Sequence, residues 1–158
     1  MLGDEQDKQD SNFKRILNLL KKGNANFAAI MNEIKPLDEI KKYAIIEKML
    51  DKDYKDFATI MEELHTWKSI PCKYFMILKI LNKGYTDFSA IMEEIKSWDN
   101  SEQNRYYKYI ILETMVNNGY EAFETIMAII EEIKVWEEPL RKYTIQPIIL
   151  KKKRKKRK

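Results

Sequence analysis

Apolar residues recur at helical spacing in four short stretches of the chain. Each stretch places a Phe first, an Ile three residues later and a Met four residues later, and the first three add an Ile or Leu at the seventh step. The four sets are Phe27/Ile30/Met31, Phe57/Ile60/Met61, Phe88/Ile91/Met92 and Phe123/Ile126/Met127. Spacings of three, four and seven residues place side chains on one face of an α-helix. Each stretch therefore predicts an amphipathic helix.

A second apolar pattern alternates with the first. An aromatic residue is followed at three, six and seven residues by aliphatic side chains. The copies are Phe13/Ile16/Leu19/Leu20, Tyr43/Ile46/Met49/Leu50, Tyr74/Ile77/Ile80/Leu81, Tyr109/Leu112/Met115/Val116 and an incomplete Tyr143/Ile149/Leu150. The period of 30 to 35 residues is typical of helical-hairpin repeats. We predict an all-α fold in which about four tandem hairpins of 30–35 residues form a short right-handed α-solenoid.

Glycine, aspartate and proline mark the predicted joints. A residue in the left-handed conformation closes many helices, and the second-pattern helices are followed by Gly23, Asp53, Gly84 and Gly119. Prolines, which start or stop helices, lie in the other links at Pro36, Pro71 and Pro139. The predicted helices span about 11–22, 25–35, 38–51, 55–67, 70–82, 86–98, 102–118, 121–136 and 138–150.

The fourth hairpin departs from the pattern. Trp136 lies thirteen residues after Phe123, whereas the third hairpin needs ten residues between its Phe and Trp. Pro147 would kink the last predicted helix. Terminal repeats commonly differ in this way because they cap the stack.

In period and hairpin plan the chain resembles tetratricopeptide, pentatricopeptide and HEAT-type arrays. The Trp-Leu-Gly-Tyr signature of the tetratricopeptide repeat is absent. The resemblance therefore implies a shape and no particular activity.

The basic charge is concentrated at one end of the sequence. Of the 29 basic residues eight form residues 151–158, which leaves 21 basic against 25 acidic residues, a net charge of −4, in residues 1–150. We predict a disordered acidic N-terminus over 1–10, a helical repeat domain over 11–150 and a disordered polybasic tail over 151–158. The tail consists of Lys151, Lys152, Lys153, Arg154, Lys155, Lys156, Arg157 and Lys158.

Three partners suit such a tail: a nuclear import receptor, the phosphates of a nucleic acid, and anionic lipid. Import ranks first, because a run of mixed Lys and Arg resembles a monopartite nuclear localisation signal. Lipid ranks lower because no acylation site lies beside the tail. A tail that only keeps the protein in solution is the remaining interpretation.

Repeated charged and aromatic positions supply candidate partner-binding residues. Acidic pairs recur in three hairpins and predict an exposed acidic ladder that contains Glu63, Glu94 and Glu132. A basic ladder of Lys42, Lys73, Lys108 and Lys142 precedes the tyrosines of the second pattern, and the two ladders could pair across helices. Tyr54, Tyr85 and Tyr120 follow the closing Gly or Asp, where they either pack in the hinge or stack on a ligand.

No catalytic, cofactor or metal site is predicted. His65 stands where the other hairpins carry Lys, so we expect it to be exposed, and the position of Cys72 carries Lys, Tyr or Arg elsewhere. Neither has a partner set for zinc binding or nucleophilic catalysis. Helical-repeat DNA glycosylases share the plan, but no residue constellation here supports that activity. The N-terminus has no signal-peptide pattern, and no run of ~18 apolar residues predicts a membrane span.

These features favour a non-catalytic, monomeric interaction scaffold in the nucleus or cytoplasm. Its partner would be a helix or an extended peptide in a groove of the solenoid. The alternative is a nucleic-acid-binding protein that uses the tail with the lysine and tyrosine positions. A composition rich in Ile, Lys, Asn and Glu also suits an AT-rich genome, and together with the import-type tail it raises the hypothesis of a secreted effector of an intracellular microbe.

Overall fold

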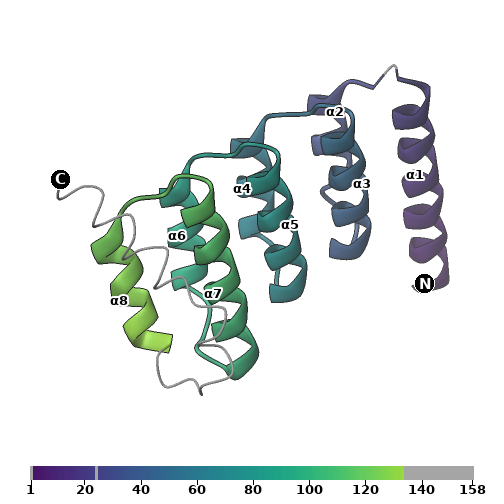
Figure 1. Cartoon of the computed structure of the whole chain (residues 1–158). Coiled ribbons are helices and arrows are strands. Elements are labelled where there is room, and N and C mark those ends of the chain that lie inside the picture. The colour runs from purple at the N-terminus through teal and green to yellow at the C-terminus, as the bar shows by residue number, and fades with distance from the viewer. Residues whose placement is uncertain (1, 24, 134–158) are drawn as a thin grey trace. The chain divides into compact units, whose positions relative to one another are not determined.

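A computed structural model describes residues 2–23 and 25–133, with side chains for 6–23 and 25–131. The described residues form eight α-helices and contain no strand, as the pattern of apolar positions predicted (Figure 1). The chain divides into two compact units, Met1–Lys83 and Gly84–Lys158, called unit 1 and unit 2 below. No helix of the described residues is long and apolar enough to cross a membrane. The solenoid and its hand stay predictions.

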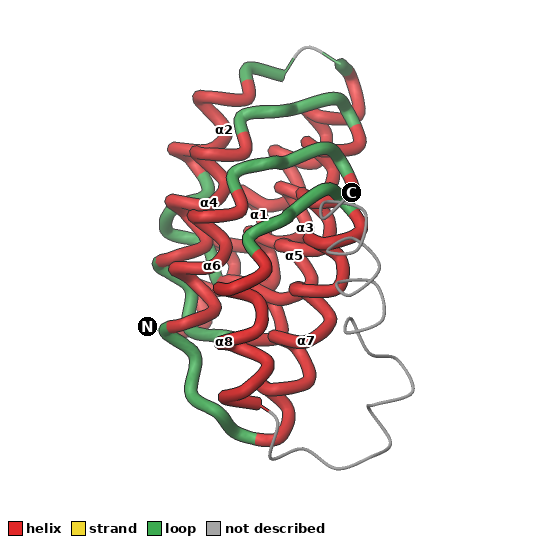
Figure 2. Tube along the Cα trace, turned by 60° about the vertical axis from the view of Figure 1, so that its left-hand side comes forward, coloured by secondary structure: helices red, strands yellow, loops and turns green. Residues whose placement is uncertain are grey.

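Unit 1 holds five helices in two layers (Figures 1 and 2). The bounds are α1 Leu2–Lys22, α2 Phe27–Glu33, α3 Glu39–Asp51, α4 Phe57–His65 and α5 Ile70–Asn82. The second-pattern helices form one layer, in which α3 packs against both α1 and α5. The shorter helices α2 and α4 lie in the other layer.

Unit 2 repeats the alternation of a short and a longer helix. Its helices are α6 Phe88–Lys96, α7 Glu102–Asn117 and α8 Phe123–Ile133, and α7 packs against α8. All eleven residues of α8 are regular α-helix, although the fourth hairpin carries three extra residues between its Phe and Trp. The predicted ninth helix, Trp136 and Pro147 lie outside the described residues.

The short helices begin later than the pattern predicted. Asn26, Asp56 and Asp87 are N-caps, and their side chains accept the amide protons of Ala29, Thr59 and Ala90 at 3.1, 3.2 and 3.2 Å. A capping side chain holds its own residue outside the helix because it replaces the missing backbone acceptor. Each helix therefore starts at its Phe, two residues after the predicted start.

Helix α1 begins earlier than predicted. We expected residues 1–10 to be disordered, but α1 starts at Leu2. The amide of Gln6 donates to Asp10 Oδ1 at 3.3 Å, one turn along the helix. Asp10 also lies 3.1 Å from Lys41 Nζ of α3. The acidic residues thus extend a helix that the apolar pattern did not reach.

The core consists of the predicted apolar positions. Ile46, Ile77 and Leu112, which stand three residues after the tyrosines of the second pattern, are all 0% exposed. Ile30, Ile60, Ile91 and Ile126 of the first pattern are at most 2% exposed. Both faces of each hairpin are therefore buried, and the two spacings identified the core correctly.

The predicted helix closures are confirmed. Asp53 has φ 66°, and Gly23, Gly84 and Gly119 have φ between 77° and 105°. The amide of Tyr54 donates to Met49 O at 3.0 Å, and the amide of Tyr120 donates to Met115 O at 2.9 Å. This bond spans the left-handed residue and identifies a Schellman closure.

Replacement of Gly119 by Ala tests this closure. At φ 103° a Cβ is strained even though no atom lies within 4 Å of its position. We expect Gly119→Ala to lower the free energy of unfolding by about 1–2 kcal/mol, measured by urea denaturation.

Asp53→Gly is the matched control. It should change the free energy of unfolding by less than about 0.5 kcal/mol, because relief of backbone strain offsets the larger entropy of Gly in the unfolded chain. A Gly119→Ala protein as stable as the unmodified chain would contradict the strain argument.

Candidate functional site

An open groove of about 680 Å³ lies in unit 1. It is lined by Met31, Asn32, Lys35, Lys42, Thr59, Glu62, Glu63 and Thr66, which come from α2, α3, α4 and the residues that follow α2 and α4. Two lysines and two glutamates balance the charge of the lining. Hydroxyl and amide groups supply further donors and acceptors. The groove is therefore polar and nearly neutral, which suits peptide groups better than a strongly charged ligand.

A buried ion pair forms part of the groove wall. Lys42 Nζ of α3 lies 2.6 Å from Glu63 Oε1 of α4, and the two residues are only 9% and 8% exposed. The indole Nε1 of the buried Trp67 also donates to Glu63 Oε1, at 3.4 Å. Pairing with an opposite charge and a second donor satisfies a carboxylate that burial would otherwise destabilise. The pair thereby ties α3 to α4.

The same residue types recur in unit 2. Trp98 Nε1 donates to Glu94 Oε2 at 2.6 Å. These two residues are four apart in the sequence, as Glu63 and Trp67 are in unit 1. Lys108 Nζ of α7 donates to Trp98 O and to Asn100 Oδ1, both at 2.8 Å. A buried Lys, Glu and Trp thus join a short helix, its exit turn and a longer helix in each unit. The Glu precedes the Trp by four residues, and this one-turn spacing is the signal for the contact that sequence reasoning missed.

The prediction of an exposed acidic ladder holds for the first residue of each acidic pair, since Glu62, Glu93 and Glu131 are exposed, but it is wrong for Glu63 and Glu94, and the lysines of the basic ladder are buried as well. Glu63 and Glu94 are 8% and 4% exposed, and Lys42, Lys73 and Lys108 are also buried. The long aliphatic stems of these side chains pack against apolar neighbours, so that the charged ends reach internal partners. The predicted pairing of the ladders does occur between Lys42 and Glu63. Glu132 and Lys142 lie outside the described side chains.

The tyrosines after the closures pack within the hinges. Tyr54 and Tyr85 are 8% and 7% exposed, and Tyr120 is half-buried. The ring of Tyr54 lies 5.1 Å from that of Phe27, and the ring of Tyr120 lies 5.1 Å from that of Phe88. Burial raises the pKa of Tyr85 to about 12. Little ring surface is therefore left on which a ligand could stack.

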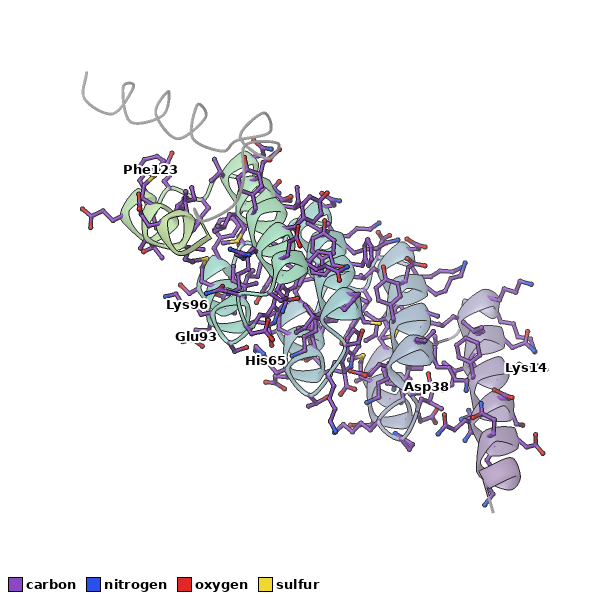
Figure 3. All side chains as sticks on the ribbon, turned by 90° about the horizontal axis from the view of Figure 1, so that it is seen from below. Lys14, Asp38, His65, Glu93, Lys96 and Phe123 are labelled. Atoms are coloured by element: carbon purple, nitrogen blue, oxygen red, sulfur yellow. The ribbon has the colours of Figure 1, made fainter. Side chains whose placement is uncertain are left out.

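The other candidate residues, His65 and Cys72, form no recognisable site within the described residues. His65 ends α4 and is exposed, as predicted (Figure 3), and Cys72 is a free, partly buried thiol of α5. Within residues 6–23 and 25–131, no three His, Cys, Asp or Glu side chains are grouped to hold a metal ion. The basic residues 151–158 lie outside the described part of the chain.

The chain matches no family model, no curated protein and no solved structure. The groove of unit 1 and the polybasic tail are therefore interpreted from their own chemistry.

Substitution of Lys42 tests the buried ion pair. Lys42→Met leaves the carboxylate of Glu63 buried without its cation, and we expect a loss of about 3 kcal/mol in the free energy of unfolding, measured by urea denaturation. The double variant Lys42→Met/Glu63→Leu should recover part of this loss, because it removes both charges. Equal losses in the single and double variants would contradict the assignment. Lys48→Met is the matched control, since Lys48 is exposed on the same helix.

Proposed function

We propose that the chain is a non-catalytic protein-interaction module. Its hairpins would stack as a short right-handed α-solenoid, and residues 151–158 would direct it to the nucleus through an import receptor. The open polar groove of unit 1 is the observation that carries the binding function.

Recurrent local structure supports the repeat architecture. Helices α2, α4 and α6 each begin at the Phe of the first pattern behind an Asn or Asp N-cap. Left-handed residues separate the longer helices from the short ones that follow them. Repeats with the same caps and closures are expected to stack alike, because each presents the same apolar faces to its neighbours.

An extended peptide suits the groove. The side-chain amide of Asn32 supplies a donor and an acceptor that can bond the main chain of a peptide, and Met31 supplies apolar contact. The Thr59 hydroxyl already donates to Asp56 Oδ2 at 2.7 Å, so it can serve a peptide as an acceptor. Lys35 and Glu62, both exposed, can select charged side chains of the partner. Lys42 and Glu63 are already bonded to each other, so their role is to fix the shape of the groove.

The lysine ladder and the tyrosines after the closures no longer favour the nucleic-acid alternative. Lys42, Lys73 and Lys108 are buried, and so are Tyr54 and Tyr85. Phosphate binding requires exposed cations, and base stacking requires exposed rings. Such binding would have to use the tail and exposed lysines outside this ladder, such as Lys35 and Lys48.

Selection from a displayed random-peptide library tests the groove. We expect Thr59→Arg, which places a large charged side chain in the groove, to weaken the selected peptides about tenfold or more, measured by titration calorimetry. Asn18→Arg, an exposed change on α1 away from the groove lining, is the matched control. Selected peptides that bind the Thr59→Arg variant as tightly as the unmodified chain would refute this site. A steep loss of binding with added salt would favour the phosphate-binding alternative instead.

The targeting role is tested by cellular distribution. A fluorescent fusion too large for passive passage through nuclear pores should accumulate in the nucleus of a eukaryotic cell. Deletion of residues 151–158 should abolish that accumulation, because an import receptor binds clustered basic side chains. Identical cytoplasmic distribution of the two forms would refute nuclear targeting. Movement from membrane to cytosol on deletion would indicate lipid binding.

A further inference from the structure

The buried ion pair in the groove of unit 1 keeps hydrogen-bonding capacity that the protein does not use. Lys42 Nζ lies 2.6 Å from Glu63 Oε1, and an ammonium group has three hydrogens to donate. No second acceptor bonds Lys42 Nζ among the described residues. Glu63 Oε1 is bonded to both Lys42 and the Trp67 indole, whereas Glu63 Oε2 receives no donor among these residues. The pair therefore retains donor hydrogens and one acceptor oxygen.

These spare groups belong to side chains that line the groove. Lys42 and Glu63 are 9% and 8% exposed, so little water reaches either of them. Glu63 Oε2 is still accessible, since it is neither bonded nor one of the fully buried atoms without a partner. A ligand that displaces water from the groove must supply an acceptor for Lys42 and a donor for Glu63, because a buried charged group without its hydrogen bonds is destabilising.

The lysine at the equivalent position of unit 2 already binds an amide oxygen. Lys108 and Lys42 each stand directly before the tyrosine of the second pattern. Lys108 Nζ donates to Asn100 Oδ1 and to Trp98 O, both at 2.8 Å. In unit 1, by contrast, no oxygen of the link between α2 and α3 bonds Lys42. A lysine at this position therefore suits amide oxygens, and in unit 1 a ligand can supply one.

A primary carboxamide matches the spare donor and acceptor of the pair. Its oxygen and nitrogen are attached to one carbon, so that the oxygen can accept from Lys42 while the nitrogen donates to Glu63 Oε2. A trans peptide bond directs its oxygen and its N–H to opposite sides, so one peptide group cannot bond both residues. A ligand carboxylate would be repelled by Glu63, and a ligand ammonium or guanidinium would be repelled by Lys42.

We infer that the Lys42/Glu63 pair is a recognition site for a carboxamide, the side chain of an Asn or Gln in the peptide that the groove binds. The amide oxygen accepts from Lys42 Nζ, and the amide nitrogen donates to Glu63 Oε2. Asn32 and Thr59 line the same groove, and their side-chain oxygens can accept the second amide hydrogen. The inference rests on the proposed peptide-binding function and specifies a residue that the peptide must carry.

Substitution within selected peptides tests the site. Peptides that are selected on the full chain from a random library, and that Thr59→Arg weakens, should share an Asn or Gln. Exchange of that residue for the matching acid, or for an aliphatic residue of similar size, should weaken binding about tenfold or more, measured by titration calorimetry. The reason is that each exchange leaves a buried donor or acceptor of the pair without its partner.

The possible failures of this experiment are distinguishable. Groove-binding peptides that share no Asn or Gln, or that tolerate its exchange, would overturn the inference and leave the peptide-binding function intact. Failure to select any peptide that is sensitive to Thr59→Arg would overturn both.

A reversal of specificity supplies an independent measurement. In Glu63→Gln the new amide oxygen can keep the bonds to Lys42 and Trp67, while the amide nitrogen replaces Oε2. Both spare groups then donate, so a peptide with the acid in place of its Asn or Gln should bind this variant more tightly than the selected peptide does. Glu33→Gln, an exposed change on α2 outside the groove lining, is the matched control and should keep the original order. The original order in a Glu63→Gln protein that urea denaturation shows to be folded would overturn the inference, and the peptide exchanges decide the matter if that variant does not fold.

Discussion

The structure depends on the simultaneous burial of two apolar faces that no single hairpin can cover alone. In unit 1, α3 packs against α1 and α5, and Ile45, Ile46 and Met49 of α3 are all 0% exposed. Truncation of one such side chain typically costs about 2–5 kcal/mol. A lone hairpin would expose these positions, so α3 requires the neighbours that α1 and α5 provide on its two sides. The caps and closures set where each helix begins and ends, but burial determines which helices meet.

Buried polar groups make the packing of helices around this apolar core specific. The pair of Lys42 and Glu63 joins α3 to α4, and the Trp67 indole fixes the orientation of the carboxylate. Such pairs contribute little net stability compared with apolar residues of the same size, but a misplaced helix would leave both charges unsatisfied. In unit 2 the lysine makes a different contact, because Lys108 bonds the exit turn at Trp98 and Asn100. One residue pattern thus supports two arrangements of hydrogen bonds.

The internal use of these charges determines what is left for partners. Several of the repeated Lys, Glu and Tyr positions face inward, and the groove of unit 1 combines repeated residues such as Glu62 with varying ones such as Asn32 and Thr59. Recurrence of a residue from one hairpin to the next therefore does not by itself tell a buried position from an exposed one. The buried repeating positions build the core, and the exposed ones, whether they repeat or vary, are accessible to a ligand.

The sequence by itself determined the helices, the core and the closures. Periodic spacing identified buried residues such as Ile46 and Ile77, and Gly119 and Asp53 identified left-handed turns, because both depend only on local geometry. It did not determine whether the side chains of Lys42, Glu63 and Tyr54 are buried, and all three were candidates for an exposed surface. Whether a long polar side chain points into solvent or into the core depends on a partner far along the sequence. Only the tertiary structure brought Lys42 to Glu63, and with them the groove between residues of α2, α3 and α4.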